Sequence, residues 1–243
     1  MRLFHSGANS YSPRMITVVI PTLNEERSLA STLTALVPAA VEGFVREVVI
    51  VDGGSQDQTL AIADEAGTKI VKSAKGRGVQ LAEGGKAAKG EWLLFLHADT
   101  VLSEGWMREA AQFIDDVDGG ARPEAAAAFR FALDDIGLKP RLLERLVAVR
   151  CGLFRLPYGD QGLLIPKRLY REIGGFRPVP IMEDVDLVRR LGRGRIFPLH
   201  AKAVTSAVRF KRDGYAFRSC RNILCQVLFT CRVPHQYIAR LYG

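Results

Sequence analysis

The sequence predicts an α/β fold, in which helices pack on both faces of a mostly parallel sheet. Short runs of β-branched and other apolar residues read as strands that are buried on both faces, as parallel strands are. Amphipathic stretches of about ten or more residues lie between these runs, which is long enough for the crossover helix of a βαβ unit. In such a sheet, ligands bind beyond the carboxyl ends of the strands.

The first half of the chain alternates regularly. Ser55 and Gln58 have the spacing of a capping box at the start of its second helix. We expect strands at 16–21, 47–52, 68–72 and 91–97, and helices at 26–38, 56–66 and 79–89.

The second half is less regular. Residues 125–133 fit a strand, although their alanines also allow a helix. No internal repeat or linker divides the chain, so we expect a flexible leader at 1–14 and one domain at 15–243. The other expected elements are a strand at 162–166 and helices at 104–117, 140–154, 167–176, 183–193 and 213–231.

Composition narrows the class of protein. A formal charge of +8 suits an anionic partner, or simply a basic surface, but no Lys/Arg block of the nucleic-acid-binding type is present. The four cysteines lack zinc-site spacing and read as free thiols of a reducing compartment. The start lacks the apolar core of a signal peptide, and the longest apolar stretch, 222–231, is too short to span a bilayer. We therefore expect a cytoplasmic protein.

Acidic residues follow two of the predicted strands. Asp52 ends a buried strand, where an aspartate can accept hydrogen bonds from a base or a ribose hydroxyl. His97 and Asp99 follow the run LLFL directly, and an oxygen ligand at this place suits Mg²⁺ or Mn²⁺ completed by substrate phosphates. The alternatives are structural: Asp99 as a helix cap and His97 as a buried neutral histidine.

Further candidate residues lie between and beyond these strands. Thr22 and Glu25 stand where the first strand ends, and Arg77 lies between two glycines before a helix, a weak signal for phosphate binding. Asp160 sits in the glycine-bracketed turn YGDQG. Glu183 and Asp184 begin a helix, where acidic groups suit the helix dipole; beside apolar neighbours, such a carboxylate has a raised pKa and can act as a general base.

These motifs together resemble the family-2 glycosyltransferases of the GT-A fold. The stretches that carry the resemblance are VVIPTLNEE, IVDGGSQDQT, LLFLHADT, GDQGLLIPK and MEDVDLVRRL, which occur in the family's order between residues 16 and 193. The GDQG stretch and the small size also resemble a bacterial subgroup of arsenosugar-biosynthesis glycosyltransferases. The resemblance implies a Rossmann-like sheet with a nucleotide-binding half at 15–100 and an acceptor-binding half with a C-terminal helix at 101–243.

The resemblance also implies a role for each candidate residue. Asp99 binds Mn²⁺ or Mg²⁺, with His97 replacing the first aspartate of the family's D-x-D motif, and Asp160 lines the acceptor or sugar pocket. Asp184 is the general base, with Glu183 beside it. The residues expected to hold the nucleotide are Pro21, Thr22, Glu25, Asp52 and Arg77.

The reaction that the resemblance implies is an inverting transfer of a sugar from a nucleoside diphosphate, most simply a UDP-sugar, to an acceptor hydroxyl. Arginines of RFKR (209–212) are further candidates to hold the leaving diphosphate. Rival interpretations are a nucleotidyltransferase, a dinucleotide oxidoreductase and a non-catalytic sugar-nucleotide-binding protein. The first lacks its phosphate loop after strand one, and the second lacks its G-x-G-x-x-G fingerprint.

The C-terminal stretch interleaves arginines with Phe, Leu and Cys. It predicts an amphipathic helix that covers the sheet, forms a homodimer or makes a peripheral contact with an anionic membrane. The sequence leaves these three alternatives open.

Overall fold

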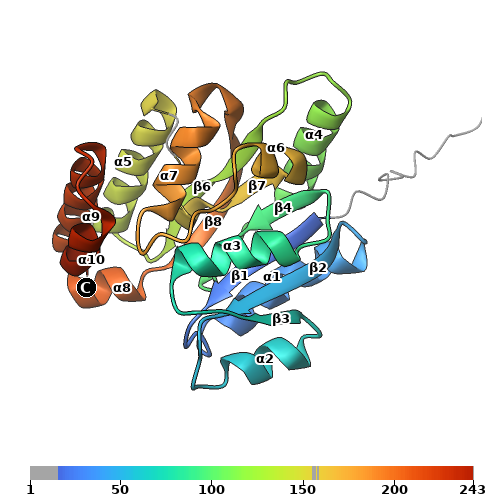
Figure 1. Ribbon diagram of the computed structural model, residues 1–243, viewed down its shortest axis with the longest axis horizontal. Coiled ribbons are helices and arrows are strands. Elements are labelled where there is room, and N and C mark those ends of the chain that lie inside the picture. The colour runs from blue at the N-terminus through green and yellow to red at the C-terminus, as the bar shows by residue number, and fades with distance from the viewer. Residues whose placement is uncertain (1–15, 155–156, 158, 243) are drawn as a thin grey trace, which may run out of the picture.

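The computed structural model describes residues 16–154, 157 and 159–242, so the predicted leader lies outside the described residues. Eight strands form one sheet in the order β3-β2-β1-β4-β7-β6-β8-β5 (Figure 1). The strands are β1 (Ile16–Thr22), β2 (Val45–Asp52), β3 (Lys69–Lys72), β4 (Trp92–Phe95), β5 (Thr100–Leu102), β6 (Ala126–Asp134), β7 (Leu163–Pro166) and β8 (Ile196–Ser206).

Helices cover both faces of this sheet, as predicted (Figure 1). They are α1 (Leu29–Val41), α2 (Thr59–Glu65), α3 (Arg77–Ala87), α4 (Trp106–Asp118), α5 (Leu138–Phe154), α6 (Lys167–Glu172), α7 (Glu183–Leu191), α8 (Val208–Asp213), α9 (Tyr215–Thr230) and α10 (His235–Tyr242), with short 3₁₀ turns η1 (Gly159–Gln161) and η2 (Arg193–Arg195).

The pleat of β1 assigns its side chains to two separate cores. Val18 and Ile20 face the core that α1 and α4 complete, whereas Val19 faces the core that α3, α6 and α7 complete. All three side chains are fully buried. A strand between two helical layers has no polar face, which is why it reads as an unbroken apolar run rather than as an alternation.

The first half of the fold brings the ends of its strands together. Strands β1 to β4 are parallel, and Thr22 pairs with Asp52, which in turn pairs with Lys72. The carboxyl ends therefore meet at one edge of the sheet. The predicted strands and helices of this half are all present, with ends shifted by up to a few residues.

The second half departs more from the prediction. The ambiguous stretch 125–133 is strand β6, while β5 and β8 have no counterpart among the predicted elements. Strand β8 pairs with β6 and β5 but exposes Pro198, His200 and Lys202 in its middle, and these interrupt the apolar run. Strand β7 is antiparallel to both β4 and β6, and the sheet remains mostly parallel overall.

The predicted capping box at Ser55 and Gln58 is wrong. Helix α2 begins only at Thr59, whose N–H donates to Asp57 Oδ1 at 3.0 Å. The hydroxyl of Ser55 instead donates to Asp52 Oδ1 at 2.5 Å. The strand-end carboxylate is the stronger acceptor, and it draws Ser55 away from the helix.

Candidate functional site

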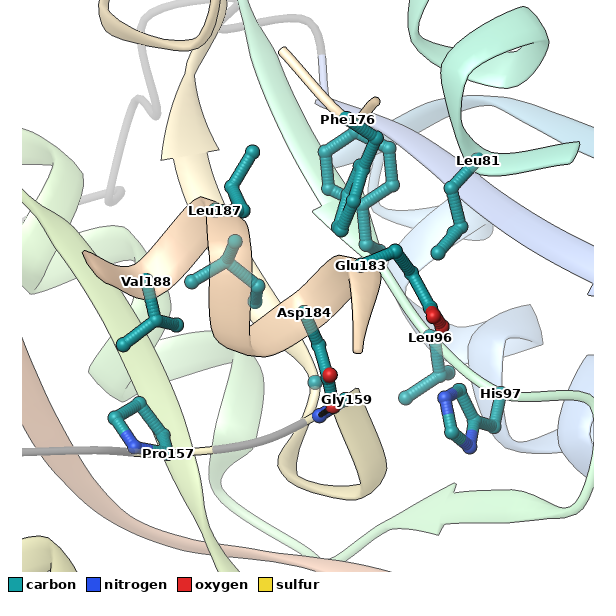
Figure 2. Close-up of a pocket in the computed structure, with 13 residues that line it drawn as sticks. Leu81, Leu96, His97, Pro157, Gly159, Phe176, Glu183, Asp184, Leu187 and Val188 are labelled. Carbon is teal, nitrogen blue, oxygen red and sulfur yellow. Dashed lines mark hydrogen bonds between the residues drawn. The ribbon is translucent and has the colours of Figure 1, made fainter. Parts of the chain in front are cut away.

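Residues from distant parts of the sequence meet at the carboxyl edge of the sheet (Figure 2). His97 leaves the end of β4, Glu183 and Asp184 begin α7, and Gly159 begins η1. They line a pocket of about 440 Å³ that is partly open to solvent. The other lining side chains are apolar and include Leu81, Leu96, Pro157, Phe176, Leu187 and Val188.

Asp52 is held entirely by its own turn and by the neighbouring strand. Its Oδ2 accepts from the N–H groups of Gly54 and Ser55 at 2.8 and 2.9 Å, and its Oδ1 accepts from the hydroxyls of Ser55 and Thr22. Burial would raise the pKa of this carboxyl, but these bonds outweigh it and lower the pKa. Both Asp52 and Thr22 are buried, so the described contacts give them a structural role in forming the turn. Their predicted contact with a nucleotide stays a prediction, as does that of Pro21.

Gln80 of α3 is a site-forming residue that the sequence interpretation missed. Its buried side-chain amide donates to the carbonyls of Thr22 at 2.7 Å and Val51 at 2.8 Å, and so ties α3 to the ends of β1 and β2. The signal was a glutamine one turn before Gly84. A Cβ at Gly84 would lie 2.2 Å from Val19, so this face of α3 packs directly on the sheet.

Glu25 and Arg209 form an ion pair at the carboxyl edge of the sheet. Arg209 of α8 donates from Nη2 to Glu25 Oε1 at 3.0 Å, while Ser28 donates its hydroxyl to Oε2 at 2.9 Å. Burial raises the pKa of Glu25 in spite of these partners, and the charge of Asp99 raises it further. The predicted nucleotide residue and an arginine of RFKR therefore form an ion pair across the site.

Arg77, the first residue of α3, interacts with three of the acidic side chains at this edge of the sheet. Its Nε lies 3.7 Å from Glu183 Oε1, and the charges of Glu183, Asp184 and Asp99 raise the pKa of its guanidinium against the opposing effect of burial. Gly78 allows this placement, because a Cβ there would lie 2.5 Å from the carbonyl oxygen of Val179. The close approach brings the segment before α7 onto the first turn of α3.

His97 is neutral in this setting. Burial, with the positive charges of Arg77 and Arg209, holds the pKa of His97 well below its ordinary value of 6.5. Its ring points into the pocket beside Gly159, where a Cβ would lie 2.9 Å from Nε2 (Figure 2). A neutral imidazole is the form that binds a metal.

Asp184 is oriented by two backbone groups. Its Oδ2 accepts from Gly159 N–H at 2.7 Å and its Oδ1 from Val185 N–H at 2.7 Å. Each carboxylate oxygen has a second lone pair, so both remain able to accept a proton or another hydrogen bond. Burial, and then the charge of Asp184, raise the pKa of the adjacent Glu183 to about 7.

Asp160 places one carboxylate oxygen in the interior of the site. Its Oδ1 is buried and has no hydrogen-bond partner among the described residues. Burial raises its pKa to about 6, with Arg150 opposing and Asp184 adding to the rise. The neighbouring Gln161 is tied down, since its amide donates to the carbonyl of Phe129 at 2.9 Å.

The charge of the cluster suits a divalent cation. Five carboxyl groups interact electrostatically with one another and with three guanidinium groups. The carboxyl groups are those of Glu25, Asp99, Asp160, Glu183 and Asp184, and the guanidinium groups are those of Arg77, Arg150 and Arg209. No group of three or more acidic, His or Cys side chains is poised as a metal site in the part of the chain that the structure describes. The assignment of Asp99 and His97 as metal ligands stays a prediction, and it would leave most of the coordination sphere to substrate oxygens and water, as is usual for Mg²⁺.

In a comparison with protein families, the model for "Glycosyl transferase family 2" matches residues 17–129. Among curated proteins, the chain is 32% identical over 169 residues to a PGL/p-HBAD biosynthesis glycosyltransferase of Mycobacterium tuberculosis, covering 58% of this chain and 60% of that protein. It is 31% identical over 109 residues to the poly(ribitol-phosphate) beta-N-acetylglucosaminyltransferase TarS of Staphylococcus aureus, covering 41% of this chain and 19% of TarS. The chain thus spans less than two thirds of these relatives.

Solved structures share the fold. Glucosyl-3-phosphoglycerate synthase from M. tuberculosis, in complex with Mn²⁺, UDP and glucosyl-3-phosphoglycerate, matches with a TM-score of 0.59 and 21% identity over 91% of this chain and 81% of that one. S. aureus TarS 1–349 matches with a TM-score of 0.61 and 19% identity over 94% of this chain and 69% of that one. Both likenesses confirm the predicted GT-A architecture.

Proposed function

We propose that this chain, which belongs to glycosyl transferase family 2, moves a sugar from a nucleoside diphosphate to an acceptor hydroxyl with inversion at the anomeric carbon. The observation that supports this most is the meeting of His97, Glu183, Asp184 and Gly159 around one pocket at the carboxyl edge of the sheet, with Arg77 beside them. Ligands of open α/β sheets bind at this edge.

The donor we propose is a UDP-sugar. Its diphosphate would meet the guanidinium groups of Arg77 and Arg209, which are held near the site by Glu183 and Glu25. When bound there, Mn²⁺ or Mg²⁺ would neutralise charge on the diphosphate, and Asp99 with His97 would hold it. UDP with Mn²⁺ or Mg²⁺ is present in the structures of glucosyl-3-phosphoglycerate synthase, which supports the choice of nucleotide and metal.

The base we propose is Asp184. A free lone pair of its carboxylate accepts the proton of the acceptor hydroxyl while that oxygen attacks the anomeric carbon. The new bond joins the acceptor oxygen to the anomeric carbon, and the bond between that carbon and the diphosphate oxygen breaks, so the electron pair leaves with the nucleoside diphosphate. The backbone N–H of Gly159 fixes the direction of the carboxylate throughout.

Several predictions stay untested. They are the acceptor, the division into a nucleotide-binding half at 15–100 and an acceptor-binding half at 101–243, the arsenosugar-type subgroup and the homodimer. A non-catalytic sugar-nucleotide-binding protein is the rival that shares most of this geometry. Placing a carboxylate with free lone pairs in the pocket favours the enzyme, because binding alone does not need a base.

A nucleotide-release assay tests this function. Purified protein is incubated with a panel of nucleoside-diphosphate sugars and Mn²⁺, and the free nucleoside diphosphate is measured, with a thermal shift recorded in parallel. We expect one UDP-sugar both to stabilise the protein and to release UDP, and chelation of the metal to abolish release. Stabilisation by the sugar nucleotide without any release, across a broad set of acceptors, would support the non-catalytic rival.

A further inference from the structure

Helix α5 carries an apolar stripe that nothing in the described chain covers. Its inner side packs on β6 through Leu143 and Val147. On the outer side five residues recur three or four positions apart, which places them in one row along the helix. They are between 56% and 84% exposed, and they are Leu138, Leu142, Leu146, Val149 and Leu153.

Basic side chains stand on both flanks of this stripe. Lys139 lies on one side, and Arg141 and Arg145 lie on the other, all of them exposed. The single acidic residue of α5, Glu144, is turned inward, where it accepts from the N–H of Leu133 and pairs with Arg141. An apolar row between two basic flanks is the pattern of a helix that lies in the surface of an anionic membrane.

Helix α9 lies at the same end of the molecule as α5 (Figure 1) and also exposes apolar side chains. Its first residue, Tyr215, packs in the same small core as Leu143 of α5. Arg218 is buried and pairs with Asp213, while Phe217, Ile223, Leu224 and Val227 face solvent and are 49% to 66% exposed. The arginines that predicted an amphipathic helix thus partly point inward, and the apolar side chains point outward.

We infer that the exposed faces of α5 and α9 form a docking surface for an anionic lipid bilayer. The charge decides between this partner and a second copy of the chain. Residues 214–243 contain four arginines and no acidic residue. Two of these arginines, Arg218 and Arg221, pair with Asp213, whereas Arg232 and Arg240 are exposed. Lys139 and Arg145 add exposed positive charge beside the stripe of α5. Two copies meeting through this surface would oppose like charges, whereas anionic lipid headgroups complement them. No helix of the described residues is long and apolar enough to cross the bilayer, so the contact is peripheral.

Vesicle sedimentation tests this surface. The full chain is mixed with phosphatidylcholine vesicles that either contain or lack phosphatidylglycerol, and the pelleted fraction is measured at low and high salt. We expect binding to the anionic vesicles, which salt weakens. The double variant Leu142→Ser with Leu146→Ser should bind about tenfold less or weaker still, because it removes two apolar side chains that insert. Arg145→Glu should also weaken binding several-fold.

A matched control separates this surface from general stickiness. Val37 and Val41 of α1 are similarly exposed, so Val37→Ser with Val41→Ser should bind like the wild type. Circular dichroism confirms that each variant is folded. Failure of the wild type to bind anionic vesicles would overturn the inference, as would unchanged binding by the α5 variant. A wild-type dimer that the α5 variant converts to a monomer, without vesicle binding, would assign the surface to a second copy instead.

Discussion

At the carboxyl edge of the sheet, Asp52 has many hydrogen-bond partners, whereas Asp160 and Glu183 have few. Asp52 accepts four hydrogen bonds from its own turn and from Thr22, and its pKa is lowered in spite of burial. Glu183 is also buried and Asp160 is partly buried, but both have few partners, and burial raises the pKa of Asp160 to about 6 and that of Glu183 to about 7. The first carboxylate stabilises the fold, whereas the second group stores unfavourable charge that a cation or a substrate can relieve.

The largest expected effect is on turnover. Asp184→Asn keeps the shape of the side chain and leaves one oxygen to accept from Gly159 N–H, at the cost of the bond from Val185 N–H, and it removes the proton acceptor. We expect the steady-state rate of nucleotide release to fall about 10²–10⁴-fold with the fold intact. Asp64→Asn, at an exposed position of α2, is the control and should leave the rate unchanged. Turnover within a few-fold of the wild type would remove Asp184 from the mechanism.

The satisfied carboxylate should matter for stability instead. Asp52→Asn keeps one oxygen for the N–H groups of Gly54 and Ser55, but places an uncharged N–H₂ donor where the hydroxyls of Ser55 and Thr22 now donate. We expect a loss of about 1.5–3 kcal/mol in the free energy of unfolding, measured by urea denaturation at neutral pH. An unchanged denaturation midpoint would mean that the turn does not depend on this charge.

Replacing Glu183 should raise the free energy of unfolding at high pH, whereas replacing Asp52 should lower it. The pKa of Glu183 is raised from its ordinary value of 4.5 to about 7, so its contribution to stability is fully present below pH 4.5 and is lost as the pH rises through 7. Glu183→Gln removes this loss. At pH 8 the variant should therefore be more stable than the wild type by about 1–3 kcal/mol, and the difference should shrink toward pH 4.5. Thermal unfolding across this range measures it; a variant less stable at pH 8 would contradict the assignment.

The smallest expected effect on stability is that of Ser55→Ala, in the same turn as Asp52. Ser55→Ala removes the 2.5 Å hydrogen bond to Asp52 Oδ1 and leaves the Asn24 N–H without its acceptor. We expect a loss of about 1 kcal/mol in unfolding free energy, because the two backbone donors still hold the carboxylate. Denaturation in parallel with Asp52→Asn checks the ranking. A larger loss than in that variant would reverse it.

The sequence predicted the first half of the fold well, because strands buried on both faces produce unbroken apolar runs. The sequence did not predict β8, because exposed and buried side chains mix along this strand. The pairing of β8 with β6, which has a register shift between Ala128 and Arg130, was therefore missed as well. Among the candidate site residues, Asp99, Glu183 and Asp184 lie close enough to act on Arg77, while their roles stay predictions. The motifs had limits of another kind. They did not reveal that Asp52 is saturated by Ser55, since that bond depends on where α2 begins.

The link between α5 and the site has a kinetic consequence. Cys151 of α5 contacts Gln161 Oε1 of η1 at 3.2 Å, and η1 also supplies the Gly159 N–H that aims Asp184. If the acceptor is carried by the same lipid surface, a catalyst attached to that surface through α5 would sample it in two dimensions. Its velocity would then follow the mole fraction of that acceptor in the surface, and diluting the surface with inert lipid would slow it at constant bulk concentration.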